Sequence, residues 1–366
     1  MSGGWDDDWP AGRPGSAGGW GDRESDRPGP PGRPETTEGR TLWPGSLPRR
    51  VPAATWGDRE SDRDPFDEGL PGAPDPSKAP IPGTVAVTGS TGLLGRALIA
   101  RARAGRWTVV PLGGSEPGGT DVTDAAAVRA RLTAARPSVV IHAAAWTDLE
   151  GCEGDPDRAV AVHGAGTAHV VAAARAVGAH VVALSTECVF SGTLDRPYRE
   201  DDSVGPRSVY GRSKLVAERE VPAEFAVVRT SWLVGAEPHG FTAAVLAQGH
   251  RGRPFPVVAD QWGCPTPVGP LADALLELGR HRSRGIWHVV GPEPRSRHQL
   301  AQELLAAAGL DPALAVAVRT HELDPRPRAE RPANGILEPA RWRALGLPDL
   351  PHHRAALADI ARAADR

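Results

Sequence analysis

Short apolar segments alternate with longer segments of helical spacing between residues 81 and 235. The short segments are rich in valine, as in strands that are buried on both faces of a sheet. The longer, alanine-rich segments suit helices. We predict strands over residues 83–89, 106–112, 138–145, 180–186 and 225–235, and helices over 93–105, 124–136, 156–178 and 208–221. This alternation predicts an α/β fold with right-handed crossovers and a doubly wound parallel sheet.

The pattern is less regular after residue 235, where helical and strand-like segments are separated by turns rich in Pro and Gly. These segments suit a smaller second lobe. We therefore predict a first domain over residues 81–235, with a return segment near 266–290. Residues 236–366 form most of the C-terminal lobe.

Residues 1–80 have a different composition from the rest of the chain. They contain 14 Gly and 14 Pro, and the sequence WGDRESDR occurs twice, beginning at Trp20 and at Trp56. Such a segment buries too little apolar surface to offset the entropy lost on ordering, so we predict a disordered tail. The alternative is that the tryptophan-bearing repeats bind a partner.

Charge and cysteine content exclude several classes of protein. A net charge of −3 gives no basis for binding nucleic acid or an anionic membrane. Three cysteines without zinc-ligand spacing predict neither a disulfide framework nor a metal site. Because we find neither a signal-like N-terminus nor an apolar run of membrane-spanning length, we expect a cytoplasmic protein with small-molecule ligands.

A glycine-rich loop, VTGSTGLLGRAL, joins the first predicted strand to its helix. Glycines in this context let the backbone approach a pyrophosphate, which the helix N-terminus attracts. The loop therefore predicts a Rossmann dinucleotide site, with an ordinary turn as the alternative. The expected cofactor contacts are Gly89, Ser90, Thr91, Gly92, Leu93, Leu94 and Gly95. Because no acid follows the second strand before Glu116, we favour NADPH over NADH, or use of both.

Tyr210 and Lys214 form an unusual pair, since the whole chain contains only two tyrosines and two lysines. They are four residues apart on a predicted helix and therefore share one face. An ammonium and an oxidised nicotinamide nearby would both favour the phenolate and lower the tyrosine pKa toward neutrality. The pair thus predicts acid–base chemistry. The alternative is an exposed helical pair without a function.

The glycine-rich loop and the tyrosine–lysine pair belong to a series of eight motifs along the chain. The motifs are VTGSTGLLGRAL, TDVTD, PSVVIHAAAWT, STECVFSG, RPYREDDSVGPRSVYGRSKLVAE, VVRTSWLVG, DQWGCPT and RPANGIL. With them, residues 83–350 resemble the extended short-chain dehydrogenase/reductases and, within these, the dTDP-4-dehydrorhamnose reductase family. The resemblance implies NAD(P)H-dependent reduction of the 4-keto group of a nucleotide-linked 6-deoxyhexose, as in dTDP-rhamnose biosynthesis. It makes the C-terminal lobe the substrate-binding lobe.

The resemblance also implies roles for individual residues. Tyr210 would protonate the ketone oxygen, Lys214 would bind the nicotinamide ribose, and Thr186 would hydrogen-bond the substrate oxygen. Further cofactor contacts would be Asp121, Val122, Ala143, Ala144 and Ala145, and substrate contacts Thr147, Trp232, Pro265, Thr266 and Arg331. A homodimer is compatible with this assignment, whereas a requirement for Mg2+ cannot be read from the sequence.

Four positions depart from the family pattern. Glu187 and Cys188 replace the Asp and the aromatic residue of the usual STDYVF, and His142 and His163 stand where Asn is common. We expect His142 to satisfy local hydrogen bonds and Cys188 to serve in packing. For His163, a proton-relay role and a local structural role are equally consistent with the sequence.

Two other functions fit the same fold. One is a sugar-nucleotide epimerase or dehydratase, although a dehydratase would carry a second carboxylate at the position of Cys188. The other is a non-catalytic dinucleotide-binding regulatory subunit, such as that of methionine adenosyltransferase. The combination of Thr186, Tyr210 and Lys214 favours the reductase.

Overall fold

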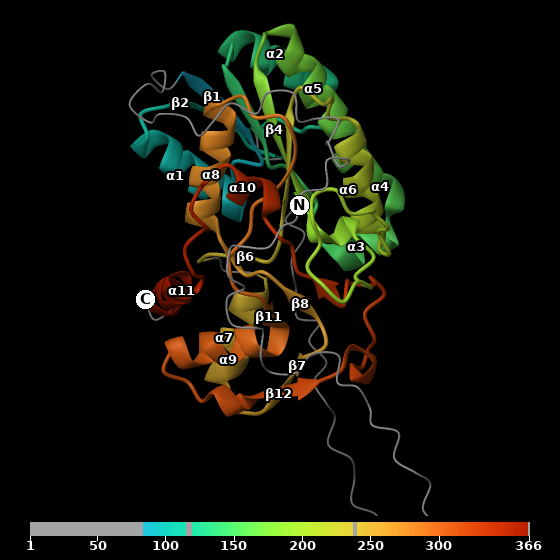
Figure 1. Cartoon of the computed structure of the whole chain (residues 1–366), viewed down its shortest axis with the longest axis vertical. Coiled ribbons are helices and arrows are strands. Elements are labelled where there is room, and N and C mark those ends of the chain that lie inside the picture. Colours follow the sequence, from blue (N-terminus) through green and yellow to red (C-terminus); the bar gives the residue numbers. More distant parts are fainter. Residues whose placement is uncertain (1–82, 115–118, 237–239, 365–366) are drawn as a thin grey trace, which may run out of the picture. The chain divides into compact units, whose positions relative to one another are not determined.

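A six-stranded parallel sheet forms the centre of the first domain in the computed structural model, which describes residues 83–114, 119–236 and 240–364 (Figure 1). Its strand order is β10-β5-β4-β3-β1-β2. The strands are β1 (Thr84–Thr88), β2 (Thr108–Leu112), β3 (Val139–His142), β4 (His180–Thr186), β5 (Ala226–Thr230) and β10 (Gly285–His288). The predicted doubly wound sheet is confirmed. The predicted disordered tail and Glu116 lie outside the described residues.

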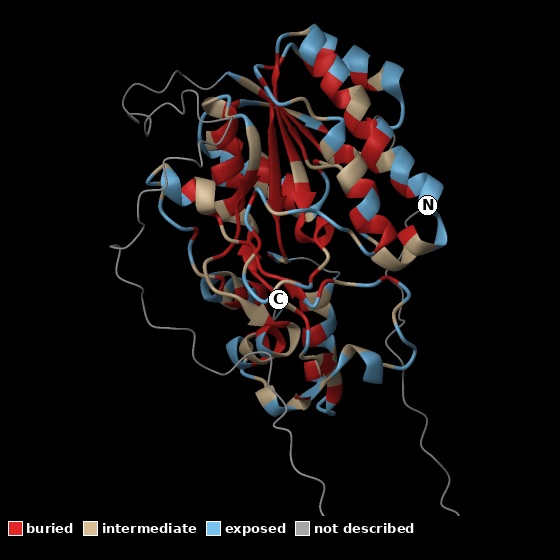
Figure 2. Cartoon of the chain, turned by 45° about the vertical axis from the view of Figure 1, so that its right-hand side comes forward, coloured by how far each residue is buried: buried red, intermediate tan, exposed pale blue. Residues whose placement is uncertain are grey.

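Helices cover both faces of this sheet because its strands are apolar on both faces. α1 (Leu93–Ala104) and α8 (Val268–Arg280) pack on one face, where Leu98 and Leu275 share a core with Val85. α2 (Ala125–Ala135) and α5 (Gly166–Ala176) pack on the other, where Leu132 and Val170 surround Ala86. Figure 2 shows the buried central strands between these helices.

The predicted helix over residues 156–178 is not one regular helix. It consists of α4 (Pro156–Val160), a π-helical turn η2 (Ala161–Ala165) and α5. Glycines allow this turn to approach its neighbours: a Cβ on Gly164 would lie 2.8 Å from Val216 Cγ1, and one on Gly166 would lie 2.8 Å from Val122 Cγ2. The turn packs on α6 (Val209–Arg219). The apolar periodicity of the segment does not reveal the extra residue in the turn.

The predicted strand over residues 225–235 is interrupted by Trp232. β5 ends at Thr230, and β6 (Leu233–Val234) follows after Trp232, whose φ of 41° breaks the extended conformation. β6 then leaves the central sheet and pairs with β9 (Thr266–Pro267). The Trp232 side chain is thereby presented outside the sheet, next to the second lobe.

The second lobe has its own apolar core, to which Leu246, Phe255, Leu304 and Ile360 contribute. Its elements are α7 (Phe241–His250), β7 (Phe255–Val258), β8 (Trp262–Gly263), β11 (Arg295–Ser296), α9 (Arg297–Ala307), η4 (Pro312–Leu314), β12 (Ala315–Val318), η5 (Thr320–Glu322), β13 (Asn334–Gly335) and α11 (Arg354–Ala364). β12 pairs with β7, while β8 lies between β11 and β13.

The chain passes between the two parts of the fold several times. After β9, α8 and β10 return to the central sheet, where β10 pairs with β5. After β13, α10 (Ala340–Ala344) returns again and buries Trp342 in the core of the sheet. Asn334, the only asparagine, helps to fix this path because its Nδ2 donates to the carbonyls of Leu194 and Arg196 at 2.8 Å each. Within the described residues, no helix combines the length and apolarity needed to span a bilayer.

Candidate active site

The loops after β1 and β3 meet at one edge of the sheet. Because the strands are parallel, the residues that follow them gather at the carboxyl edge. Gly89, with φ of +64°, follows β1, and a Cβ there would lie 2.8 Å from Ala143 O and from Ala144 N in the loop after β3. Two of the predicted groups of cofactor contacts are therefore adjacent, and the contact between them requires glycine.

The glycine-rich loop leaves the first turn of α1 open. A Cβ on Gly95 would lie 2.0 Å from Gly89 O, so the loop can fold against the helix only with glycine at this position. Among the residues that the structure describes, no side chain caps the N-terminus of α1 at Gly92, and both Thr91 and Gly92 are exposed. The unpaired amides of this turn suit a diphosphate, so the loop fits a dinucleotide cofactor.

The tyrosine–lysine pair lies on α6, as the sequence predicts. Ser208 caps this helix by accepting a hydrogen bond from Gly211 N at 3.1 Å. Tyr210 and Lys214 are both buried, being 9% and 4% exposed. Lys214 Nζ donates to the carbonyl of Leu184 in β4 at 2.7 Å. This bond fixes the ammonium beside the strand that ends at Thr186.

Thr186 lies where α6 meets the carboxyl end of β4. Its hydroxyl donates to Glu187 Oε2 at 2.8 Å and accepts from Cys188 N at 3.2 Å, at the start of the short helix η3 (Glu187–Val189). A Cβ on Gly211 would lie 2.2 Å from Cys188 O, which measures how closely α6 approaches this turn. The Thr186 side chain is close enough to Tyr210 to lower the pKa of its phenol. The structure thus gathers the three predicted catalytic residues at one strand end.

The pKa of Tyr210 is raised, which corrects the expected lowering for the free protein. Burial disfavours the phenolate most, followed by the neighbouring Cys188, Glu187 and Cys152, whereas Thr186 acts in the opposite direction. Tyr210 is therefore a protonated phenol at neutral pH. A residue that must donate a proton to a substrate is in the required state before the reaction begins.

Burial has the opposite effect on the lysine. It lowers the pKa of Lys214 to about 8, although Glu218 on the same helix favours the ammonium.

Cys188 has a raised thiol pKa, mainly because it is buried and secondly because of the negative charge of Glu187. This cysteine is therefore an unreactive packing residue at neutral pH.

His163 occupies the π-helical turn and uses both of its ring nitrogens locally. Nε2 accepts from Trp146 N at 2.9 Å, so Nδ1 carries the proton and donates to Ser213 Oγ at 2.7 Å. Ser213 in turn donates to the Tyr210 carbonyl at 2.9 Å. Burial, followed by Lys214, lowers the pKa of His163 to about 3, so the ring is neutral. It lies edge-on to the Tyr210 ring, with centroids 5.5 Å apart.

His142 continues this network toward the glycine-rich loop. Thr167 Oγ1 donates to the His163 carbonyl at 2.5 Å, so it accepts from His142 Nε2 at 3.0 Å. Thr88 Oγ1 then donates to His142 Nδ1 at 2.8 Å and accepts from Ala144 N at 3.2 Å. Hydrogen bonds therefore link the end of β1 to α6 through His142, Thr167 and His163, and both histidines have structural partners.

The remaining predicted cofactor contacts lie after β2 and β3. Asp121 is exposed, and its Oδ1 accepts from Thr123 N at 2.9 Å. Val122 is buried, and its carbonyl contacts His169 Nδ1 at 3.0 Å. Ala145 is exposed, whereas the two alanines before it are half-buried.

The predicted substrate contacts differ in their surroundings. Trp232 packs flat on β8, where a Cβ on Gly263 would lie 2.5 Å from its Cε2. Thr147 is exposed, and Arg331 is half-buried with its Nη1 3.1 Å from Glu150 Oε1. These residues have surfaces that a ligand can reach.

Pro265 and Thr266 lie in the interior instead. Both are buried, and the Thr266 hydroxyl donates to Cys264 O at 2.9 Å and accepts from Gly291 N at 3.1 Å. These bonds join β9 to the segment after β10. The surroundings of Thr266 indicate a role in fixing this junction, which supports the neighbouring Trp232.

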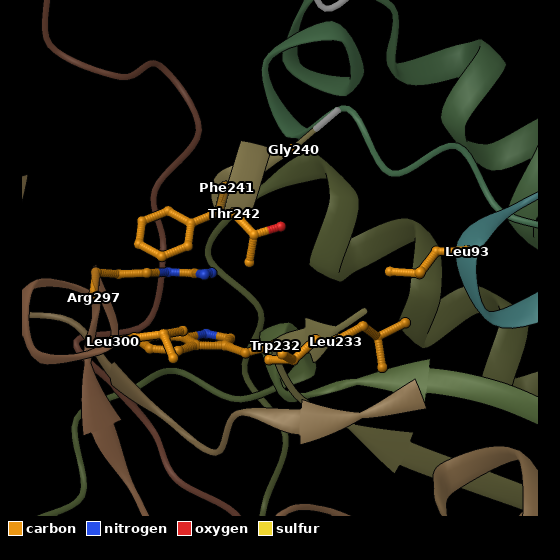
Figure 3. Close-up of a pocket in the computed structure, with 9 residues that line it drawn as sticks. Leu93, Trp232, Leu233, Gly240, Phe241, Thr242, Arg297 and Leu300 are labelled. Carbon is orange, nitrogen blue, oxygen red and sulfur yellow. The ribbon is translucent and has the colours of Figure 1, made fainter. Parts of the chain in front are cut away.

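The sequence interpretation missed two residues beside Trp232. Arg297 and Phe241 line a pocket of about 100 Å³ together with Trp232 and Leu93 of α1 (Figure 3). Arg297 is the first residue of α9 and Phe241 the first of α7, 56 positions apart. No local spacing connects them, so only the folded chain reveals the pocket.

Comparisons with known proteins agree with this geometry. The family model described as RmlD substrate binding domain matches residues 83–365. The dTDP-4-dehydrorhamnose reductase of Streptomyces griseus is 41% identical over 282 residues, which cover 75% of this chain and 91% of that protein. A probable dTDP-4,6-dihydroxy-2-methyloxan-3-one 4-ketoreductase of Streptomyces antibioticus is 37% identical, with 74% and 92% covered.

The solved structures give the same result. A crystal structure of dTDP-4-dehydrorhamnose reductase from Bacillus anthracis str. Ames, in complex with NADP, matches with a TM-score of 0.71 and 28% identity. The match covers 76% of this chain and 98% of that one. With the family model and the relatives in agreement, the chain belongs to the RmlD family of extended short-chain dehydrogenases/reductases.

Proposed function

We propose that this protein reduces the 4-keto group of a nucleotide-linked 6-deoxyhexose with a nicotinamide dinucleotide as reductant. The observation that carries the proposal is the convergence of Thr186, Tyr210 and Lys214 where α6 meets the end of β4, at the same edge of the parallel sheet as the glycine-rich loop. Relatives named as dTDP-4-dehydrorhamnose reductase and dTDP-4-keto-6-deoxy-D-glucose reductase support this class of reaction.

The open amides of the first turn of α1 would hold the cofactor's diphosphate, with Gly89 and Gly95 allowing its close approach. When bound, NADPH or NADH supplies the hydride. NADPH remains the favoured choice, in line with the NADP complex of the Bacillus anthracis reductase. Asp121, Val122 and the 143–145 loop are proposed to flank the cofactor farther along the carboxyl edge.

Two side chains would act on the ketone, and a third would support them. Tyr210, protonated at neutral pH, donates its proton to the oxygen as negative charge develops there. Thr186 orients that oxygen through a hydrogen bond, with its own hydroxyl held by Glu187. Lys214 binds the nicotinamide ribose and contributes positive charge that stabilises the resulting tyrosinate.

Residues around the second lobe would hold the sugar nucleotide. Trp232, Thr147 and Arg331 have surfaces available for this purpose. Thr266 and Pro265 would support the wall behind Trp232. Glu187 adds a polar group at the substrate end of the site, and its burial raises the pKa of its carboxyl.

The substrate is identified by a direct screen. The purified protein is incubated with NADPH or NADH and with dTDP-, UDP- and GDP-linked 4-keto-6-deoxyhexoses, and the absorbance of the reduced cofactor is followed. We expect oxidation of the cofactor with at least one of them, with product stereochemistry read by NMR. Absence of turnover on all of them, together with tightly retained NAD⁺, would instead indicate an epimerase or dehydratase.

The lowered pKa of Lys214 predicts that activity depends on pH in the range from about 7 to 9. Since the pKa of Lys214 is about 8 in the free protein, the ammonium is present below that pH and is lost above it. We expect kcat/KM for reduction to fall as the pH rises through about 8, well below the ordinary lysine value of about 10.4. The measurement is a pH–rate profile from pH 6 to 10.

Lys214→Arg provides the control for this profile. A guanidinium stays charged across this range, so the residual activity of this variant should lack the alkaline decrease. An unchanged decrease in the variant would assign the titration to another group.

A further inference from the structure

The pocket beside Trp232 lies where the glycine-rich loop faces the second lobe. Leu93, the first residue of α1, lines one side, while Trp232, Phe241, Thr242 and Arg297 line the other (Figure 3). Its volume of about 100 Å³ suits a group of phosphate size rather than a whole nucleotide. The pocket is therefore placed to receive one part of a larger ligand that extends along the lobe.

Aromatic rings cover both faces of the Arg297 guanidinium. Its Cζ lies 3.7 Å from the centroid of the Trp232 ring and 4.9 Å from that of the Phe241 ring. Figure 3 shows the guanidinium between these rings, with its nitrogen-bearing end directed across the pocket toward Leu93. Stacking occupies the faces of the planar group and leaves its N–H donors available only at the edge.

No protein group satisfies this edge within the described part of the chain. There, no carboxylate lies within 4.0 Å of the Arg297 side chain, and no acceptor forms a hydrogen bond with it. Other half-buried arginines of the lobe are paired, as Arg295 is with Glu303 at 2.7 Å. A guanidinium whose donors face a pocket and meet no protein acceptor suits an anionic ligand.

The surrounding charges agree with this interpretation. Burial, followed by the positive charge of Arg331, works against the Arg297 guanidinium, while Glu187 favours it. The pKa of Arg297 is lowered to about 10, so the group stays charged at neutral pH. Glu187 also accepts a hydrogen bond from Thr186. The carboxylate that favours the Arg297 charge therefore contacts one of the three predicted catalytic residues.

We infer that Arg297, clamped between Trp232 and Phe241, binds the diphosphate of the nucleotide-sugar substrate through paired hydrogen bonds from its edge. A guanidinium edge matches two phosphate oxygens in geometry and charge. The inference rests on the proposed function and adds to it a residue that discriminates nucleotide-linked sugars from free sugars. The cofactor is the other source of phosphate, but every aromatic and cationic member of the pocket lies outside the glycine-rich loop.

The test compares phosphate-bearing and phosphate-free probes by isothermal titration calorimetry. Binding of dTDP, UDP, GDP, thymidine and NADPH is measured for the wild type, Arg297→Gln and Arg297→Lys. We expect Arg297→Gln to lose at least ten-fold in affinity for the nucleoside diphosphate that the wild type prefers. Affinities for thymidine and NADPH should stay within two-fold. Arg297→Lys keeps the charge but not the paired donors, so its loss should be intermediate.

Arg251→Gln is the matched control, because it removes an exposed arginine from the same lobe, just after α7. It should bind every probe as the wild type does.

Equal diphosphate affinity in Arg297→Gln and wild type would overturn the inference alone, as would a loss confined to NADPH. A wild type that binds none of the three diphosphates would overturn the proposed function as well. Thermal unfolding of each variant, followed by circular dichroism, identifies a misfolded protein, in which case the lysine variant decides.

Discussion

Tyr210→Phe should lower the kcat of ketone reduction by about 10²- to 10⁴-fold, the range contributed by general acid catalysis. The substitution removes only the hydroxyl, and the ring keeps its edge-on packing against His163. Tyr210 is 9% exposed, and phenylalanine fills the same space except for the volume of one oxygen atom. The measurement is oxidation of NADPH at saturating keto sugar, together with the dissociation constant of NADPH.

Tyr198→Phe is the natural control, since Tyr198 is the only other tyrosine. It is also buried, and its hydroxyl accepts hydrogen bonds from Thr193 N at 2.9 Å and Leu194 N at 3.2 Å. We expect this variant to lose about 1 kcal/mol of unfolding free energy and to keep its kcat. Equal turnover by Tyr210→Phe and wild type would eliminate Tyr210 as the proton donor.

Gly95→Ala should weaken NADPH binding by about 100-fold or more. The new methyl would lie 2.0 Å from Gly89 O and 2.7 Å from Ser90 Cα, and neither backbone atom can rotate away. The loop must therefore move off the helix, which disperses the amides proposed to bind the diphosphate. Loss of two hydrogen bonds to a charged group, at about 1.5–3 kcal/mol each, gives a decrease of this size. Fluorescence titration with NADPH measures it.

Gly105→Ala tests whether any added methyl at an end of α1 has this effect. Its Cβ would have ordinary contacts, the nearest being Arg101 O at 3.4 Å. NADPH affinity should stay within two-fold of the wild type. If Gly95→Ala binds NADPH as well as Gly105→Ala does, the cofactor does not depend on the closed loop.

The sequence predicts those parts of the site that depend on local spacing. The glycine-rich loop needs only three glycines between a strand and a helix, and Tyr210 and Lys214 need only helical periodicity. The parallel sheet then brings the ends of β1, β3 and β4 to one edge without further information. The proximity of Thr186 to Tyr210, in contrast, is predicted only through the family resemblance, because strand spacing does not place a residue of the helix.

Features that depend on distant packing could not be predicted in this way. The π-helical turn is accommodated by the contact of Gly164 with Val216, 52 residues away. Thr266 belongs to a motif, yet its hydroxyl is occupied by Cys264 and Gly291, which only the path of the chain determines. The direction of the Tyr210 pKa shift also required the structure, because burial is its largest cause and the neighbouring Cys188, Glu187 and Cys152 raise the pKa further.

The return of β10 and Trp342 to the central sheet has a consequence for engineering and for synthesis on the ribosome. A chimera that exchanges the second lobe between relatives cannot be made with a single junction near residue 235. The exchanged segment would also contain β10 of the central sheet and Trp342 of its core. Junctions are needed wherever the backbone changes sides. During translation, the edge of β5 that pairs with β10 stays unpaired until residues 285–288 have been synthesised. The central sheet is therefore completed only after much of the second lobe has been made.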